Sequence, residues 1–489
     1  MAGGGGKPQN IFRLNRGDDP KEVLNWRLWF AVVSFGIMGA ARGVDEGLIS
    51  GTLGKSHFIQ LLGLDKMDEV ELANVEGNIS AMVQIGSVGG AGLAFLLCDR
   101  IGRLWATRQL CCLWILGIVI FLTNGGRLGQ VYAGRFIAGL GIGQTTVVAP
   151  VYLSEIAPKS VRGLCTCAFS GSVYIGIMLA YFTSWGSELH IKAGTSNQWV
   201  VPTTLHIMFA GIIMILSLFN YESPRYLVKI SQDDLATTNL ARVRGLPVDH
   251  EHVIKEIAEI QQQLHEENEA TLGQGWVGIL KEMFLMPNNF YRIYLGLFSQ
   301  LLSQWSGAQS ITIYAPTFFA LLGTKGQNEK LFATAIFGVV KFVAAIMCAL
   351  FLVDVIGRKR ALGIGITLQA ASMCFIAAFL TAVPGISDAE DFQFTPSQKH
   401  ASTAAIVMIY LSGFGWAMGW NSMQYLLNAE IYPLRIRSLE GMDRLFRLPW
   451  YKIGRFGEED ANEQQAVADL VAQEKDATTR ETATQVEKA

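Results

Sequence analysis

The chain has 489 residues, of which 51% are hydrophobic and 16% charged, and its formal net charge is −2. Soluble globular chains carry about a quarter of charged residues, so this balance argues against an ordinary cytosolic enzyme. The small net charge gives no electrostatic case for nucleic acid as a partner. Apolar residues instead gather in runs of roughly 20, the length of a helix that crosses a bilayer. The sequence therefore predicts an all-α membrane protein embedded in the lipid bilayer.

The apolar runs follow one another along the chain, and we expect each to span the membrane. Six runs precede a long polar stretch and four follow it: 27–51, 76–98, 104–123, 129–153, 164–185 and 199–219, then 291–321, 331–353, 361–383 and 402–427. In the polar stretch, Val253, Ile257 and Leu264 recur at helical spacing among Lys and Glu residues, which predicts a surface helix.

The runs divide the chain into five expected parts. These are an N-terminal segment (1–25), a first transmembrane half (26–220), a helical linker (221–290), a second half (291–438) and a tail (439–489). The charged composition of the tail and its few aromatic residues predict disorder. Lys and Arg enrich alternate loops, while the loop after the first run is acidic, so we expect both termini and the linker to be cytoplasmic.

The two halves repeat each other in sequence. The pattern Asp-x-Ile-Gly-Arg at 99–103 returns at 354–358, and Glu-Ile-x-Pro at 155–158 returns at 430–433. Each pair occupies the same place in its half. This is the pattern of a duplicated transporter whose binding site lies between the repeats.

A longer motif carries a family resemblance. Gly134-Arg135-x-x-x-Gly139-x-Gly141-x-Gly143 continues to Pro150-x-Tyr152-x-x-Glu155, and Glu222-Ser223-Pro224-Arg225 follows the sixth run. From about residue 23 to 438 the chain resembles the sugar-porter branch of the major facilitator superfamily, in its fungal form. The resemblance implies a helical bundle with a mid-membrane cavity, in the plasma membrane, that acts as a monomer without metal or cofactor. It also implies alternating-access transport, by proton symport, of a sugar, polyol or sugar acid, with no chemical bond changed.

Two charges lie deep in the first half. Asp45 falls within the first run and Arg135 near the start of the fourth. An unpaired charge there costs at least ~2.5 kcal/mol, so a pair is the cheaper arrangement. The resemblance implies that protonation of Asp45 releases Arg135 and couples protons to transport, while a static buried ion pair stays open as an alternative. Arg42 and Glu46, in the same run, have no counterpart in the family pattern.

The resemblance places the substrate site in spans 5, 7 and 10. The seventh span reads Ser303-Gln304-Trp305-Ser306-Gly307-Ala308-Gln309, where the family has Gln-Gln-x-x-Gly-x-Asn, and Ser170 replaces a fifth-span glutamine. Hydroxyls in place of amides change which ligand groups are satisfied, so a sugar acid, cyclitol acid, unusual pentose or disaccharide is as plausible as a common hexose. The expected substrate-binding residues are Gln300, Ser303, Gln304, Gln309, Ser170, Asn421 and Tyr425. Alternatively, each of these three glutamines connects two helices through hydrogen bonds and does not contact substrate.

Charges at the predicted cytoplasmic ends of the helices suggest a gate. The resemblance implies that they form networks that close this side and break when it opens, the alternative being simple anchoring charges. The residues concerned are Asp99, Arg103, Glu155 and Arg162 in the first half and Asp354, Arg358, Glu430 and Arg435 in the second.

The second half looks incomplete beside the twelve-span family. After Arg437 no apolar run returns, and Ser438-Leu439-Glu440-Gly441 resembles the start of a cytoplasmic tail. We therefore expect six plus four spans, with two helices missing between Ser438 and Leu439. Two other functions stay open, a nutrient sensor that does not transport and an inactive truncated product.

Overall fold

The computed structural model describes residues 20–158, 160–271, 285, 287–324, 326–347, 358–383 and 394–421. In these residues every regular element is a helix, which confirms the all-α prediction. Eight of the described helices are long and apolar enough to cross a membrane. The helices within 20–257 and 299–421 form one compact unit, and Ala258–Phe298 belongs to a second.

Each of the first six apolar runs forms a helix. The helices are α1 (Trp26–Leu53), α3 (Glu69–Ile101), α4 (Arg103–Leu122), α5 (Leu128–Ile156), α6 (Arg162–His190) and α7 (Asn197–Leu218), with the short α2 (Ser56–Leu62) after α1. The Asn25 side chain accepts hydrogen bonds from the backbone N–H groups of Arg27 and Leu28, and so caps the start of α1. Gly102, with φ +88°, separates α3 from α4.

Glycines bring these helices into close contact. Small residues let α3 pack closely on α5, because a Cβ atom added at Gly86 would overlap the Phe136 carbonyl oxygen and one at Gly143 would overlap Ser87. Glycines also bring α1 against α6, where a Cβ atom at Gly43 would overlap the Val173 carbonyl oxygen. α1 thus packs directly against the backbone of α6.

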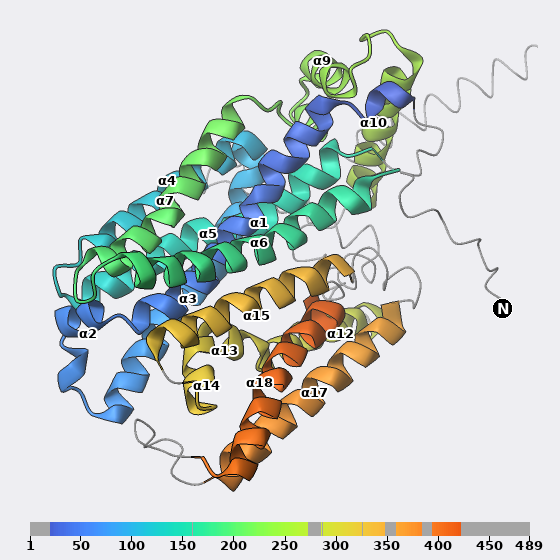
Figure 1. Ribbon diagram of the computed structural model, residues 1–489. Helices are drawn as coiled ribbons and strands as arrows, with labels where there is room; N and C mark the ends of the chain where they lie inside the picture. The colour runs from blue at the N-terminus through green and yellow to red at the C-terminus, as the bar shows by residue number, and fades with distance from the viewer. Residues whose placement is uncertain are drawn as a thin grey trace, which may run out of the picture. The chain divides into compact units, whose positions relative to one another are not determined.

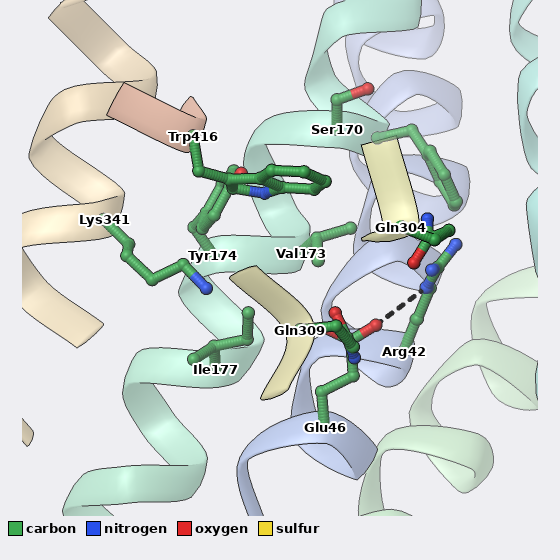
Figure 2. A pocket seen from close by; sticks show the side chains of 11 residues that line it. Arg42, Glu46, Ser170, Val173, Tyr174, Ile177, Gln304, Gln309, Lys341 and Trp416 are labelled. Carbon is green, nitrogen blue, oxygen red and sulfur yellow. Dashed lines mark hydrogen bonds and ion pairs between the residues drawn. The ribbon is translucent and has the colours of Figure 1, made fainter. Parts of the chain in front are cut away.

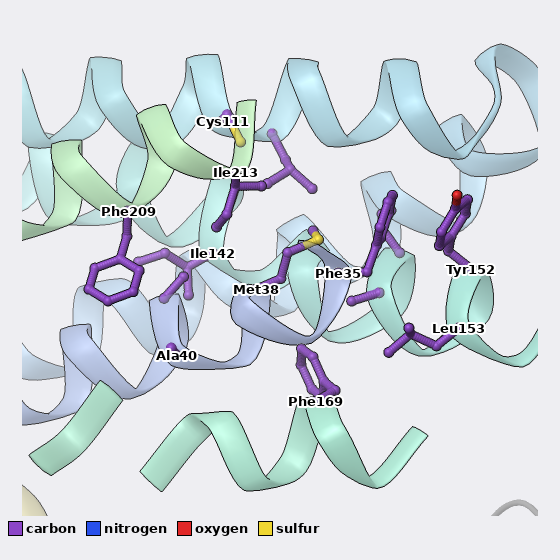
Figure 3. Packing of buried hydrophobic residues seen from close by; sticks show 14 of the residues in the cluster. Phe35, Met38, Ala40, Cys111, Ile142, Tyr152, Leu153, Phe169, Phe209 and Ile213 are labelled. Atoms are coloured by element: carbon purple, nitrogen blue, oxygen red, sulfur yellow. The ribbon is translucent and has the colours of Figure 1, made fainter. Parts of the chain in front are cut away.

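Buried apolar side chains fill the space among α1, α4, α5, α6 and α7. In Figure 3 the rings of Phe35 and Tyr152 lie face to face, and their centroids are 3.7 Å apart. Met38, Ile142 and Phe209 belong to the same cluster and are at most 5% exposed. Removing apolar surface from water stabilises a fold by about 25 cal/mol for each Å2, so this cluster holds the first-half helices together around α1.

The described part of the polar stretch after α7 is helical, as its spacing predicts. It contains α8 (Pro224–Lys229), α9 (Asp233–Arg244) and α10 (Glu251–Thr271). Val253 and Ile257 are buried against Leu240 and Tyr226, so the apolar face of α10 is a packing face.

The predicted seventh span is broken into three helices, α12 (Pro287–Trp305), α13 (Ala308–Ile313) and α14 (Ala315–Leu321). The first break falls at Gly307, whose φ of +79° is a left-handed conformation that side chains disfavour. Discontinuous helices of this kind expose backbone and polar side chains at mid-membrane depth in transporters. The break lies among the residues predicted to contact substrate.

Three long helices follow. They are α15 (Gln327–Met347), α17 (Arg358–Ala382) and α18 (Pro396–Trp416), and α18 continues into a π-helical turn, η5 (Ala417–Asn421). α15 packs along α6, and α17 packs along α18 (Figure 1). The Tyr181 hydroxyl of α6 donates to the Thr312 carbonyl oxygen of α13 at 2.7 Å, so the broken span is also tied to α6.

Candidate functional site

Asp45 and Arg135 form a buried ion pair between α1 and α5. Arg135 Nη1 donates to Asp45 Oδ1 at 2.6 Å, and each residue is 3% exposed. Arg135 Nε also donates to the Ile79 carbonyl oxygen at 3.4 Å. The pair supplies each buried charge with a partner, which is the condition for keeping charges inside a membrane protein.

His206 of α7 lies behind this pair. Its Nε2 atom is 4.0 Å from Asp45 Oδ1, and its ring packs edge-on against Trp114. Within the part of the chain that the structure describes, the Nδ1 atom is buried and has no hydrogen-bond partner. The sequence analysis missed His206, although an ionisable residue inside an apolar run is a functional signal in its own right.

A polar cavity opens beside the charged turn of α1, with an empty volume of about 520 Å3 including its mouth. It is lined by α1, α6, the broken span, α15 and α18 (Figure 2). The polar and aromatic residues of the lining are Arg42, Glu46, Phe169, Ser170, Tyr174, Gln304, Gln309, Lys341 and Trp416. We call it the central cavity.

The lining of the central cavity carries two cations and one carboxylate. Arg42 Nε and Glu46 Oε1 are 3.1 Å apart, so this acid is paired with its neighbour one turn away on α1. Lys341 projects from α15 and is 3% exposed. Figure 2 shows the Arg42 and Lys341 side chains entering the cavity from opposite sides.

The predicted substrate residues fall into three groups. Gln304, Gln309 and Ser170 line the central cavity, whereas Gln300 and Ser303 belong to α12 but are not among its lining residues. Gln309 Nε2 is buried and has no hydrogen-bond partner among the described residues. The Asn421 side chain and Tyr425 lie outside the described residues, and the tenth-span aromatic residue that lines the cavity is Trp416.

The lining includes residues that the sequence analysis left unassigned. Arg42 and Glu46 had no role, and Lys341 went unremarked within the run 331–353. Each is an ionisable residue in a membrane-length apolar run, the signal that identifies candidate sites by default. Tyr174 lies one helical turn after Ser170, so the same face of α6 supplies both.

Three of the four first-half gate residues, Asp99, Arg103 and Glu155, form a charge network at the junction of α3 and α4. Arg103 donates from Nε and Nη2 to both oxygens of Glu155, at 2.9 and 2.7 Å, and Nη2 lies 2.9 Å from Asp99 Oδ1. Lys229 Nζ lies 3.3 Å from Asp99 Oδ2. The first two backbone N–H groups of α4 donate to the Glu222 carboxylate at 3.0 and 3.1 Å, which places a negative charge at a helix N-terminus.

Burial raises the pKa of Glu222, and this outweighs the lowering effect of the backbone N–H groups and the Arg103 charge. Arg162 is the first residue of α6, and its side chain is exposed. Of the second-half gate residues, Arg358 begins α17, but its side chain and the residues Asp354, Glu430 and Arg435 lie outside the described part of the chain.

Solved structures of a bacterial transporter share this fold. The xylose transporter XylE from E. coli, in a partially occluded inward open conformation, superposes with a TM-score of 0.67 at 19% identity, over 86% of this chain and 89% of that chain. XylE bound to 6-bromo-6-deoxy-D-glucose, described as a major facilitator superfamily proton:xylose symporter, gives 0.67 at 20% identity, over 91% and 90%. The helical bundle of this chain therefore has the same fold as these structures.

The chain belongs to the family described as Sugar (and other) transporter, whose profile matches residues 30–440. Among curated proteins, the "Probable quinate permease" of Aspergillus niger is 32% identical over 422 residues, covering 86% of this chain and 77% of the relative. The protein of the same name from Neosartorya fischeri is 31% identical over the same shares. Transport, rather than chemical conversion, is the activity of this family.

Proposed function

We propose that the protein moves a polyhydroxylated solute, a sugar, polyol or sugar acid, through the central cavity by alternating access coupled to protons. The observation that carries the proposal is the buried Asp45–Arg135 pair on the same turn of α1 that lines the cavity. The relatives are named as quinate permeases, and XylE is described as a proton symporter. Both descriptions agree with a proton-driven carrier of such solutes.

Proton coupling follows from the chemistry of the pair. A proton on Asp45 removes the charge that holds Arg135 Nη1 at 2.6 Å, and the guanidinium then needs another acceptor. Such an exchange favours a different helix arrangement, so protonation and conformation change together. His206, 4.0 Å from the Asp45 carboxylate, is positioned to bias that step.

The substrate would be held by the broken span and α6. Gln304, Gln309 and Ser170 supply donors and acceptors for hydroxyl groups, and Trp416 supplies an apolar face. Gln300, Ser303, Asn421 and Tyr425 remain proposed contributors from the sequence pattern. Gln309 Nε2 is a donor without an acceptor among the described residues, which supports the central cavity as the ligand site.

The gate, the topology and the domain division belong to the same proposal. Asp99, Arg103, Glu155 and Arg162, with Asp354, Arg358, Glu430 and Arg435 in the second half, would close the cytoplasmic side. Both termini and the linker 221–290 would lie in the cytoplasm, and the protein would act as a monomer in the plasma membrane. The spans would number six in 26–220 and four in 291–438, because no apolar run follows Arg437.

Uptake by the purified full chain in proteoliposomes tests the proposal. An inward proton gradient should drive accumulation of quinate or another member of a panel of sugars and sugar acids, and a protonophore should reduce it to equilibration. A nutrient sensor would bind members of the panel without accumulating them. An inactive product would neither bind nor accumulate them. Equal accumulation with and without the gradient would reject proton coupling while leaving transport in place.

A further inference from the structure

Lys341 is a cation buried in an otherwise apolar part of α15. Its Nζ atom donates to Thr312 Oγ1 at 2.7 Å and lies 5.3 and 5.7 Å from the ring centroids of Phe337 and Tyr174. Within the part of the chain that the structure describes, no carboxylate lies within 4.0 Å of Nζ. A hydroxyl and two ring faces are therefore its described contacts, while Glu46 attracts it from beyond contact distance.

This environment leaves the ammonium group undersatisfied. An ammonium has three donors, and one is used by Thr312. Aromatic faces attract a cation but do not neutralise it, and a buried charge without a counter-charge is costly in a membrane protein. The remaining donors have the central cavity beside them, into which Figure 2 shows the side chain extending.

The other charges of the cavity do not meet this need. Glu46 attracts the Lys341 ammonium group electrostatically, but its contact partner is Arg42, whose Nε atom lies 3.1 Å from Glu46 Oε1. Lys341 is thus the cation of the described cavity lining that no carboxylate neutralises at contact distance. A neutral sugar in the cavity would leave the positive charge of Lys341 without a counter-charge, whereas a carboxylate would neutralise it.

The geometry points to Lys341 as the carboxylate-binding residue of the central cavity, which therefore selects a polyhydroxylated carboxylate over its neutral analogue. Gln309, whose buried Nε2 lacks an acceptor, and Gln304 would receive the hydroxyl groups of the same ligand. The inference rests on the proposed function, because it assumes that the cavity is the transport site. It adds the charge of the substrate and the residue that recognises it.

Matched pairs of acid and neutral solutes test the inference in proteoliposomes that contain the full chain. Quinate is compared with quinamide, and D-galacturonate with D-galactose, in the wild type and in Lys341→Met, Lys341→Arg and Lys330→Met. The wild type should prefer the acid of at least one pair. Lys341→Met should raise KM for that acid about tenfold to one-hundredfold, the range that a charge-assisted hydrogen bond contributes, and should change KM for the neutral member less than threefold.

The control variants separate charge from structure. Lys330 lies on the same helix but does not line the cavity, so Lys330→Met should keep the acid preference. Lys341→Arg keeps a cation and should retain most of it. Thr312→Val removes the hydrogen bond between α15 and α13 while leaving the charge, and should also retain the preference. Met at position 341 removes a buried charge without opening a cavity, so surface abundance should not fall.

Three results would overturn the inference. A wild type that takes neutral members as well as acids would show that the cavity does not select a carboxylate, and the proposed transport function would survive. Loss of the acid preference in Thr312→Val to the same extent as in Lys341→Met would assign the effect to helix packing. Failure of the wild type to bind or take up any member would reject the proposed function itself, and the inference with it.

Discussion

Asp45 is the residue on which proton coupling depends in the proposed mechanism. Asp45→Asn keeps the size and a hydrogen-bonding oxygen but behaves as a permanently protonated acid, and it leaves Arg135 without its counter-charge. We expect proton-driven accumulation to fall to equilibration while exchange of solute across the membrane persists. Loss of one partner of a buried pair costs about 3–5 kcal/mol, so uptake is to be measured per surface molecule.

Asp65→Asn is the matched control for this experiment. Asp65 is an exposed residue of the short 3-10 turn after α2, and no ion pair of the described residues includes it. It should accumulate solute as the wild type does. Undiminished accumulation in Asp45→Asn would remove this residue from the coupling step and favour a static ion pair.

Gln304 tests the substrate site in a different way. Gln304→Ala removes a cavity-facing amide from an exposed position, so folding should change little while substrate affinity falls. A lost hydrogen bond of roughly 0.5–1.5 kcal/mol raises KM about twofold to tenfold. Uptake kinetics of the variant, set beside Gln60→Ala on the exposed surface of α2, provide the measurement. Unchanged KM with normal expression would indicate that Gln304 bridges helices instead.

At the level of helices, the close contact of α1 with α6 depends on several glycines, of which Gly43 is one. A Cβ atom at Gly43 would overlap the Val173 carbonyl oxygen, and backbone atoms cannot rotate away as a side chain can. Gly43→Ala should therefore destabilise the protein by about 1–3 kcal/mol, the usual cost of overpacking, despite the better helix propensity of alanine. Thermal unfolding in detergent measures this.

The comparison variant is Gly92→Ala in α3, where an added Cβ atom meets nothing within 4 Å. There the propensity gain should dominate, and stability should stay the same or rise by up to about 1 kcal/mol. Equal effects of the two variants would mean that α1 and α6 separate readily, and that the close approach has no energetic importance.

The sequence predicted the helices well because membrane-length apolar runs leave few alternatives. It did not predict the break in the seventh span, since Gly307 reads as one more small residue until its positive φ is known. The pairing of Asp45 with Arg135 followed from the cost of unpaired charge and the family resemblance. Lys341 was missed because a lone Lys in an apolar run has no pattern around it, and its place beside Tyr174 depends on packing between α15 and α6.

For the whole molecule, we expect the chain with ten spans to be a poor transporter. Without two helices, one flank of the second half would face lipid. Polar residues such as Gln304 and Gln309 would then be exposed to hydrocarbon or to water leaking through the protein. Individual helices should still insert, because each carries its own apolar length. A version with two family-like helices restored between Ser438 and Leu439 should give at least tenfold more uptake per surface molecule.

Both forms are to be expressed in one transport-deficient host, with surface abundance measured alongside uptake. Equal uptake per surface molecule would show that the ten-span form is complete in itself. Equal abundance with unequal uptake is the expected result, because insertion depends on each helix while alternating access depends on both halves.

Asp45 and Glu46 are consecutive residues of α1, so their side chains leave the helix about 100° apart. The first reaches Arg135 on α5, and the second lines the central cavity with Arg42. In the proposed mechanism, a small rotation of this one turn would displace both groups at once and so link the affinity for a proton to the affinity for a solute in both directions. Energy exchange between the two gradients would then require no relay across the protein, because it would take place within a single turn of helix.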